Sequence, residues 1–214
     1  MRGVFITLEG ADGCGKSTQA ALLADAIVAS GREVVRLREP GGTPISEKIR
    51  ALLLDPANAE MCPECELLLY EASRAQLVRQ VIDPALSRGA VVLCDRFYDS
   101  TRAYQAGGRG IDATLVDVAN ELGRCGRVPD RTLVLDLDPG TAYARATAGG
   151  ADRMEAEGLA FQERVLESFR RLADEEPTRV RLVDASGEKD QVTARLLAEL
   201  ADLVGAVGRP GNGA

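Results

Sequence analysis

Hydrophobic residues in this chain fall into short apolar runs that alternate with longer amphipathic segments. Runs rich in Val, Leu and Ile, without strict alternation of apolar and polar residues, are typical of strands buried on both faces of a sheet. They predict strands at residues 3–8, 33–37, 90–94, 131–137 and 179–183. Between them the pattern predicts helices at residues 16–29, 45–54, 63–82, 113–122, 139–147, 159–173 and 190–207. This alternation indicates an α/β fold of three layers, in which helices flank a five-stranded parallel sheet.

Proline and glycine mark the ends of several predicted elements. Asp138 followed by Pro139 provides an N-cap and a first-turn proline, which favours a helix start at that point. Pro84 and Gly89 predict that the long helix ends before the third strand. The glycine-rich segment 208–214 is expected to be disordered, so residues 1–207 are predicted to form one domain.

Composition narrows the class of protein. Of 214 residues, 45% are hydrophobic, which is sufficient for a core, and no apolar run approaches the length of a membrane span. We find no secretory signal pattern, and the five cysteines lack the spacing of a disulfide framework, so a cytoplasmic protein without a membrane partner is expected. The net charge of −7 disfavours a nucleic-acid binder, because such proteins need a basic face.

The first strand leads into a glycine-rich loop of the form G-x-x-x-x-G-K-[ST], and a helical pattern follows it. In such loops the backbone N–H groups turn toward a phosphate, and the N-terminus of the next helix favours the same anion. The sequence predicts a nucleoside triphosphate site in which Lys16 reaches the outer phosphates and Ser17 ligates Mg²⁺. The alternative is a glycine turn that only joins strand to helix. The loop residues are Gly10, Ala11, Asp12, Gly13, Cys14, Gly15, Lys16, Ser17 and Thr18.

Arginines at the ends of two strands add to this site. Arg38 follows the second predicted strand, and Asp95-Arg96 follows the third. The carboxyl ends of parallel strands share one crevice with the phosphate loop, so both arginines are expected to face the same ligand. Two further cations predict a second phosphate-bearing substrate, and ion pairs that close loops are the alternative. The guanine-reading stretch Asn-Lys-x-Asp of GTP switches is absent from the sequence.

Several motifs resemble those of thymidylate kinases, and they occur in the order of that family from the first strand to about residue 185. They are Arg38-Glu39-Pro40-Gly41-Gly42-Thr43, Tyr70-Glu71-Ala72-Ser73-Arg74-Ala75-Gln76, Asp95-Arg96-Phe97-Tyr98-Asp99-Ser100-Thr101-Arg102-Ala103-Tyr104-Gln105, Gly107-Gly108-Arg109-Gly110 and Phe161-Gln162-Glu163-Arg164. The resemblance implies a P-loop kinase fold with a short mobile lid. It also implies transfer of the γ-phosphoryl group of ATP to dTMP, and a homodimer.

The resemblance further implies a role for each matching residue in the dTMP site. Tyr70 stands where the family has an aromatic residue, usually phenylalanine, that stacks on thymine, and Arg74 would hydrogen-bond the thymine O4. Their i, i+4 spacing places both on one helix face. A core aromatic and a surface charge are the alternative reading of these two residues. The other implied dTMP-site residues are Asp12 at the 3′-hydroxyl, Arg38 and Arg96 at the phosphate, Thr101 at the base edge, Tyr104 against the 2′ position, and Ser100 and Gln105 of the same motif.

Phosphoryl transfer to a nucleotide fits the absence of histidine from the chain. A phosphate oxygen is already largely ionised at neutral pH, so the reaction depends on alignment and charge neutralisation rather than on a general base. Lys16, Mg²⁺ and arginines can supply the charge. Asp95 would assist the Mg²⁺, directly or through water.

Position 13 and the lid differ from the expected pattern. Some members of the family carry a catalytic arginine inside the phosphate loop, where this chain has Gly13, and others carry it in the lid. The lid, residues 145–157, offers only Arg145 and Arg153. We expect Arg145 to bind ATP and Arg153 to swing over the transferred phosphoryl group, so the predicted catalytic set is Lys16, Arg96, Arg153 and Asp12.

Two questions stay open in the sequence. Cys62-Pro63-Glu64-Cys65 lacks the further ligands of a structural zinc site, so a helix start with two thiols is favoured over zinc shared across a dimer. The activity has alternatives too: another nucleoside monophosphate kinase or a deoxynucleoside kinase, or a nucleotide-dependent switch whose output is partner binding.

Overall fold

The structure, a computed structural model, describes residues 2–149 and 152–205. Five parallel strands form one sheet in the order β2-β3-β1-β4-β5. Their bounds are β1 Val4–Glu9, β2 Val34–Arg38, β3 Val91–Asp95, β4 Arg131–Asp136 and β5 Val180–Asp184. Each lies within about a residue of the predicted strand, so the five-stranded parallel sheet is confirmed.

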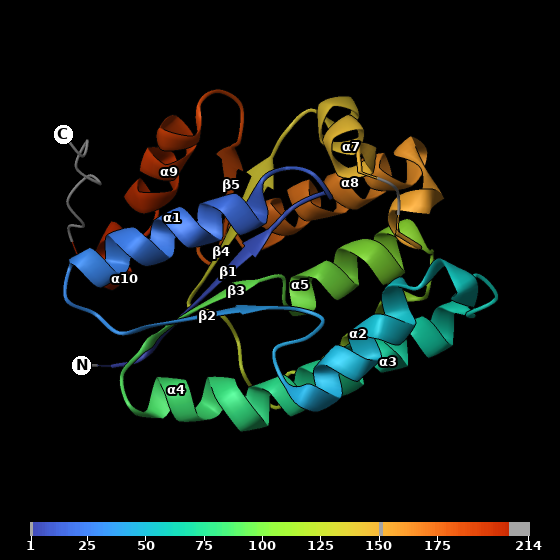
Figure 1. The fold of residues 1–214 in the computed structure, drawn as a ribbon, viewed down its shortest axis with the longest axis horizontal. Helices are drawn as coiled ribbons and strands as arrows, with labels where there is room; N and C mark the ends of the chain where they lie inside the picture. Colours follow the sequence, from blue (N-terminus) through green and yellow to red (C-terminus); the bar gives the residue numbers. More distant parts are fainter. Residues whose placement is uncertain (1, 150–151, 206–214) are drawn as a thin grey trace.

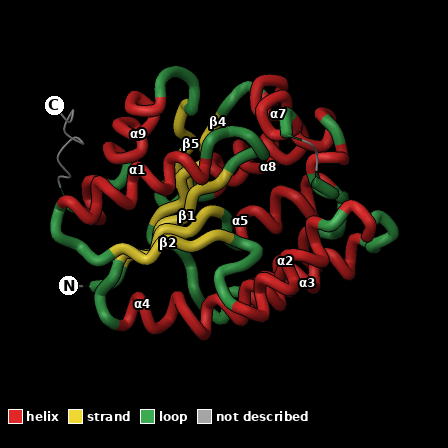
Figure 2. Tube along the Cα trace, in the orientation of Figure 1, coloured by secondary structure: helices red, strands yellow, loops and turns green. Residues whose placement is uncertain are grey.

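Helices cover both faces of the sheet (Figures 1 and 2). One face carries α1 (Lys16–Ala29) and α9 (Lys189–Ala198), and the other carries α4 (Asp83–Ser87) and α8 (Leu159–Glu175). On the second side α3 (Pro63–Leu77) packs against both α2 (Pro44–Leu54) and α6 (Ala113–Gly123). The remaining long helix, α7 (Pro139–Thr147), contacts α8, and its N-cap is Asp138 as predicted.

The side chains of β1 show why the central strands are apolar throughout. Val4, Ile6 and Leu8 join the core beneath α1 and α9, whereas Phe5 points to the opposite core beneath α3 and α4. Alternate residues therefore fill two different cores, and both need apolar side chains. A third core, around Phe169 of α8, packs against β4 and β5.

The long helix ends before the third strand, as predicted, but it runs through Pro84 and past its predicted end at residue 82. The helix continues from α3 through a π-helical segment, η2 (Val78–Ile82), into α4, and it ends at Ser87. In this segment the Asp83 N–H donates to the Val78 carbonyl, five residues back. A π-type turn widens the helix, which accommodates a proline that has no N–H and would otherwise clash with the preceding turn.

Two other helical segments differ from the prediction. Residues 98–108, where no helix was predicted, form α5 (Tyr98–Thr101) and a π-helical segment, η3 (Arg102–Gly108). Ser100, Thr101 and Gln105 are buried there, so the segment lacks the apolar stripe from which helices are predicted. The predicted helix at 190–207 divides into α9 and α10 (Ala201–Val204), with the buried Leu200 at the turn between them.

Short 3-10 turns complete the described elements: η1 (Pro56–Asn58) and η4 (Glu155–Glu157). The tail at 208–214, predicted to be disordered, lies outside the described residues. Among the helices that the structure describes, none has both the length and the apolar character needed to cross a membrane.

Candidate active site

The phosphate loop joins β1 to α1 as its sequence predicts. Gly10 has a φ of 134° and Gly15 a φ of 101°, conformations that L side chains rarely adopt. Lys16 is buried, and its Nζ donates to the carbonyls of Gly10 (3.1 Å) and Ala11 (2.9 Å). The ammonium group is thus held inside the loop, where a bound phosphate would lie.

Gly13 is required by packing as well as by its φ of 80°. A Cβ added at this position would lie 2.0 Å from the Ala142 carbonyl oxygen, because α7 lies directly against the loop. An arginine at this position, as some members of the family are expected to carry, has no room here.

Oxygen ligands for a cation meet next to the loop. The Ser17 hydroxyl donates to Oδ2 of Asp95 over 2.6 Å, which brings together the start of α1 and the end of β3. A hydroxyl and a carboxylate are the hard oxygen donors that Mg²⁺ prefers. Within the described ranges no group of three or more Asp, Glu, Cys or His side chains could hold a metal, so Mg²⁺ would need the oxygens of a nucleotide as well.

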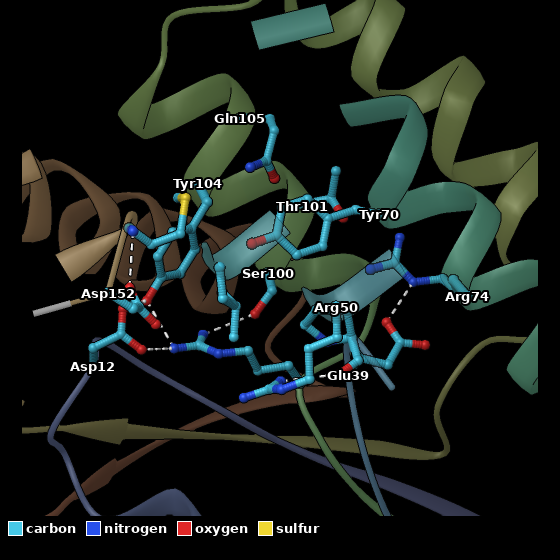
Figure 3. A pocket seen from close by; sticks show the side chains of 14 residues that line it. Asp12, Glu39, Arg50, Tyr70, Arg74, Ser100, Thr101, Tyr104, Gln105 and Asp152 are labelled. Atoms are coloured by element: carbon cyan, nitrogen blue, oxygen red, sulfur yellow. Dashed lines mark hydrogen bonds and ion pairs between the residues drawn. The ribbon is translucent and has the colours of Figure 1, made fainter. Parts of the chain in front are cut away.

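A second cavity lies beside the loop (Figure 3). Tyr70 of α3 and Tyr104 of η3 lie on opposite sides of it in this view, and Gln105 is drawn between them. Aromatic walls with a few polar groups are typical of a site for a small planar ligand. The lining residues are Asp12, Glu39, Pro40, Arg50, Leu54, Tyr70, Arg74, Arg96, Ser100, Thr101, Tyr104, Gln105, Asp152 and Met154.

One wall of this cavity is a network of Arg96, Asp12 and Tyr104. The guanidinium of Arg96 pairs with Asp12 Oδ1 and donates from Nη2 to the Tyr104 hydroxyl over 2.8 Å. That hydroxyl donates to Asp12 Oδ2 over 2.9 Å, and the guanidinium lies 4.7 Å from the centre of the Tyr104 ring. Burial alone would raise the pKa of Asp12, but the charges of Arg96 and Lys16 outweigh it and lower the pKa to about 2. Asp12 is therefore ionised at neutral pH.

Glu9, at the end of β1, holds the backbone that presents Arg96. Arg96 has a φ of 73°, which is strained for a residue with a side chain. The carboxyl group of Glu9 accepts from the Phe97 N–H (2.7 Å) and the Ser100 hydroxyl (2.5 Å), both of which follow Arg96 in the chain. Burial, and then the charge of Asp99, raises the pKa of Glu9 to about 8.

Arg74 reaches the cavity from a buried ion-pair cluster. Its Nε donates to Glu39 Oε2 over 2.8 Å, and its Nη1 bonds to Glu71 and to Asn120 Oδ1 (3.1 Å). The side chain is 1% exposed, so it is not a surface charge. Its Nη2 has no hydrogen-bond partner among the described residues and remains available at the cavity wall.

The residues of the phosphate loop line a cavity of their own, called here the phosphate-loop cavity, and it adjoins the second cavity. Both are lined by Asp12, Glu39, Arg50, Arg96 and Asp152. A ligand on the loop would therefore meet a ligand in the second cavity at a place that carries two arginines. This is the arrangement needed for transfer of a group between two bound molecules.

Comparison with known proteins agrees with this geometry. The family model described as thymidylate kinase matches residues 8–196. This chain belongs to the thymidylate kinase family. The thymidylate kinase of Trichlorobacter lovleyi is 48% identical over 200 residues, which cover 90% of this chain and 94% of that protein. The thymidylate kinase of Pseudomonas putida strain GB-1 is 47% identical over 205 residues, which cover 95% and 98%.

A solved structure extends the similarity to the fold. The crystal structure of thymidylate kinase from Ehrlichia chaffeensis is 33% identical, with a TM-score of 0.78, and the match covers 94% of this chain and 100% of that one. The family resemblance inferred from the motifs is thereby confirmed. The chain is a phosphotransferase of the thymidylate kinase family, with the P-loop kinase fold.

Most residues that the thymidylate kinase motifs implicated lie at these two cavities. The second cavity contains all the residues expected to bind dTMP except Arg38. Arg38 lines the phosphate-loop cavity instead, where its Nη2 pairs with Glu47 Oε2 at 3.0 Å and its Nη1 donates to the Pro40 carbonyl. Arg145, near the end of α7, also lines the phosphate-loop cavity.

Arg153 is placed differently from the expectation for a catalytic lid arginine. Its side chain is 6% exposed, pairs with Glu66 and donates to the Leu53 carbonyl. Of the described residues that line either cavity, its neighbours Asp152 and Met154 are included and Arg153 is not. The structure thus brings one lid arginine, Arg145, to the phosphate loop and keeps the other away from it.

Sequence reasoning missed several residues of this thymidylate kinase site. Arg50 and Asp152 line both cavities, and Met154 lines the second. Glu39 also lines both cavities, and its place beside Arg38 in a family motif is a signal in the sequence that it belongs to the site. Arg50, one turn beyond Glu47 on an amphipathic helix, has no local pattern that separates it from a solvated charge.

The two cysteines of the C-x-x-C stretch are exposed at the N-terminus of α3. They belong to no group of three or more potential ligands in the part of the chain that the structure describes. The helix start predicted at Pro63 is confirmed.

Proposed function

We propose that this chain transfers the γ-phosphoryl group of ATP to dTMP and so forms dTDP and ADP. One observation carries the proposal: the phosphate-loop cavity and the second cavity have five lining residues in common. They are Asp12, Glu39, Arg50, Arg96 and Asp152. The phosphate loop holds ATP, the phosphoryl donor. The second cavity, called the acceptor cavity from here on, holds dTMP with its phosphate toward the loop. The phosphoryl group then passes between two fixed oxygens, which supplies much of the rate enhancement by positioning alone.

In this proposal the acceptor cavity recognises thymine with three groups. Tyr70 stacks on the ring, and Nη2 of Arg74 donates to O4. Gln105 donates its Nε2 to Glu66 over 2.8 Å, so its Oε1 is left to accept from the thymine N3–H. Cytosine offers an amino donor in place of O4 and no N3–H, so both contacts fail for dCMP.

The sugar and the phosphate of dTMP are held by the network around Arg96. Asp12, ionised because of Arg96 and Lys16, accepts a hydrogen bond from the 3′-hydroxyl. The Tyr104 ring, fixed by its hydrogen bond to Asp12, crowds the 2′ position. Arg96, with Arg38 and Arg50 around it, holds the phosphate that attacks.

Charge on the transferred group is neutralised by Lys16, Arg96 and Arg145. No histidine is needed, because the attacking phosphate oxygen carries its negative charge at neutral pH. Ser17 and Asp95 would hold Mg²⁺, whose charge offsets that of the donor phosphates when it is bound.

An acceptor panel tests the proposal. Purified protein with Mg²⁺ and ATP is assayed for ADP release with dTMP, dUMP, dCMP, AMP and thymidine as separate acceptors. We expect dTMP to give the highest kcat/KM. A higher value for another monophosphate or for thymidine identifies a different kinase, and ADP release that is independent of any acceptor indicates a nucleotide switch.

We further propose a homodimer in the cytoplasm. Leu115, Val118 and Leu122 lie at i, i+3 and i+7 of α6 and are 63%, 66% and 79% exposed, and Leu68 of the adjacent α3 is 64% exposed. An exposed apolar stripe on two packed helices supports a dimer in which a second copy of the chain buries these side chains. Sedimentation should give twice the monomer mass, and Val118→Glu should shift it to the monomer.

A further inference from the structure

Glu66, a buried carboxylate on α3, collects donors from two separate parts of the chain. Gln105 donates to it over 2.8 Å and Arg109 over 3.0 Å, and Arg153 pairs with it at 2.5 Å. Glu66 is 0% exposed. Burial by itself raises the pKa of Glu66, but the hydrogen bonds from Arg109 and Gln105 outweigh it and lower the pKa, so the group is ionised at neutral pH.

Two donor groups of the Arg153 guanidinium bind partners away from the phosphate loop. Its Nη2 is taken by Glu66 and its Nε donates to the Leu53 carbonyl over 2.7 Å. Its backbone N–H donates to the Leu54 carbonyl over 3.3 Å. The residue is therefore fixed to the end of α2 and to α3 by main chain and side chain together.

The residues on either side of Arg153 face the acceptor cavity. Met154 lines that cavity, and its sulfur lies 3.5 Å from Nη2 of Arg153 and 3.6 Å from Nη2 of Arg109. Asp152 lines both cavities, and its Oδ1 accepts from the backbone N–H groups of Met154 and Glu155. Residues 152–155 thus form a compact turn, and Arg153 is its anchor.

We propose that Arg153 is a positioning residue rather than a catalytic arginine, and that its ion pair with Glu66 fastens the turn 152–155 across the acceptor cavity. The inference rests on the proposed dTMP site. Fastening the turn fixes Met154 and Asp152 as part of the cavity wall before dTMP arrives. Releasing it therefore weakens acceptor binding and leaves the transfer step nearly intact.

The test compares Arg153→Met, Arg153→Lys, Glu66→Gln and the double variant Glu66→Gln/Arg153→Met. The measurements are kcat, KM for dTMP, KM for ATP, and the Kd of dTMP without ATP by calorimetry. We expect each single variant to raise the dTMP Kd at least about tenfold while kcat falls less than about threefold, because ground-state binding is lost. The double variant should be about as weak as Glu66→Gln alone, because Arg153 acts through Glu66, whereas Glu66 also holds Gln105 and Arg109.

Arg131→Met is the matched control. Arg131 is also buried, with Nη1 donating to the Glu199 carbonyl and Nη2 pairing with Asp202, but it begins β4, at the end of the strand away from the site. Its loss should lower the Tm and leave the dTMP Kd unchanged. Should the Arg153 variants lower the Tm with every kinetic and binding constant unchanged, the role is structural only and the proposal is wrong.

Arg153→Lys separates positioning from catalysis and is the variant least prone to misfold. Lysine keeps the charge but cannot reach both the Leu53 carbonyl and Glu66 as the guanidinium fork does. If Arg153→Met lowers kcat by about a hundredfold or more, and lysine restores it with the dTMP Kd unaltered, Arg153 acts on the transferred group and the proposal is overturned. Failure of the unmodified protein to use dTMP would instead contradict the proposed function.

Discussion

The hydroxyl of Ser17 donates a hydrogen bond of 2.6 Å to Oδ2 of Asp95, and this contact joins the phosphate loop to the end of β3. Asp95 ends β3, and Ser17 begins α1, which follows β1; the two meet because β1 pairs with β3. Both side chains line the phosphate-loop cavity. Their meeting point is therefore the place where a cation would contact protein and nucleotide together.

The first prediction concerns this pair. Ser17→Ala should raise the Mg²⁺ concentration needed for half-maximal activity about tenfold. Removing one group that supports a metal site lowers metal affinity by a factor of about this size. Ser17→Thr keeps the hydroxyl and should behave as the parent. The measurement is a Mg²⁺ titration at saturating ATP and dTMP. Equal titration midpoints for the alanine and threonine variants would remove Ser17 from the cation site.

The second prediction concerns Arg74 and its two carboxylates. Arg74→Ala leaves Glu39 and Glu71 buried without their cation, so the free energy of unfolding should fall by about 3–5 kcal/mol. Arg74→Lys keeps a charge for the carboxylates but loses the donor at the cavity wall. We expect its preference for dTMP over dCMP to fall by about 1–3 kcal/mol in the ratio of kcat/KM values. A lysine variant with the parental ratio would contradict base reading by Arg74.

The third prediction separates the ring of Tyr104 from its hydroxyl. Tyr104→Phe keeps the ring beneath Arg96 and loses the hydrogen bond to Asp12, so exclusion of ribose should persist while the dTMP KM rises. Tyr104→Ala removes the ring and should admit 5-methyluridine monophosphate. The ratio of kcat/KM for dTMP and the ribonucleotide measures this. If the alanine variant excludes the ribonucleotide as firmly as the parent does, Tyr104 is not the steric barrier.

The fourth prediction is a pH dependence of stability that arises from Glu9. Its pKa is about 8 in the folded protein against an ordinary value of 4.5, because burial favours the neutral acid. The resulting stabilisation is fully present below the unfolded pKa and is lost as the pH rises through the folded one. The free energy of unfolding should therefore decline between about pH 5 and pH 8, on the order of 1 kcal/mol per pH unit for this group.

Glu9→Gln provides the comparison for that decline. The amide stays neutral at every pH, so the variant should lose less stability than the parent over the same interval. Glu39, whose pKa burial raises to about 7, adds a second contribution that ends at lower pH and remains in the variant. Urea unfolding at a series of pH values measures both proteins. Identical slopes would mean that Glu9 is ionised in the folded protein throughout.

The sequence alone determined those features whose signals are local. The strands follow from apolar runs, and the phosphate loop follows from glycine spacing, because positive φ angles and exposed N–H groups are properties of a few consecutive residues. Placing Arg96 and Asp95 at the loop followed from a further general rule, that parallel strands end at one edge of the sheet. The motifs then specified Tyr70, Arg74 and Tyr104.

Only the tertiary structure decided how the polar residues are paired. The helical segment 98–108 has no apolar stripe, because its buried face is made of the hydroxyls and amides that line the cavity. The sequence predicts that Arg145 and Arg153 both serve the phosphates, yet one lines the phosphate-loop cavity and the other is held by Glu66. A charge shows its role only through the partner that it meets, and Glu66 reaches Arg153 because α3 and the turn at 152–155 are folded onto the same cavity. Such long-range pairing leaves no periodic trace along the chain.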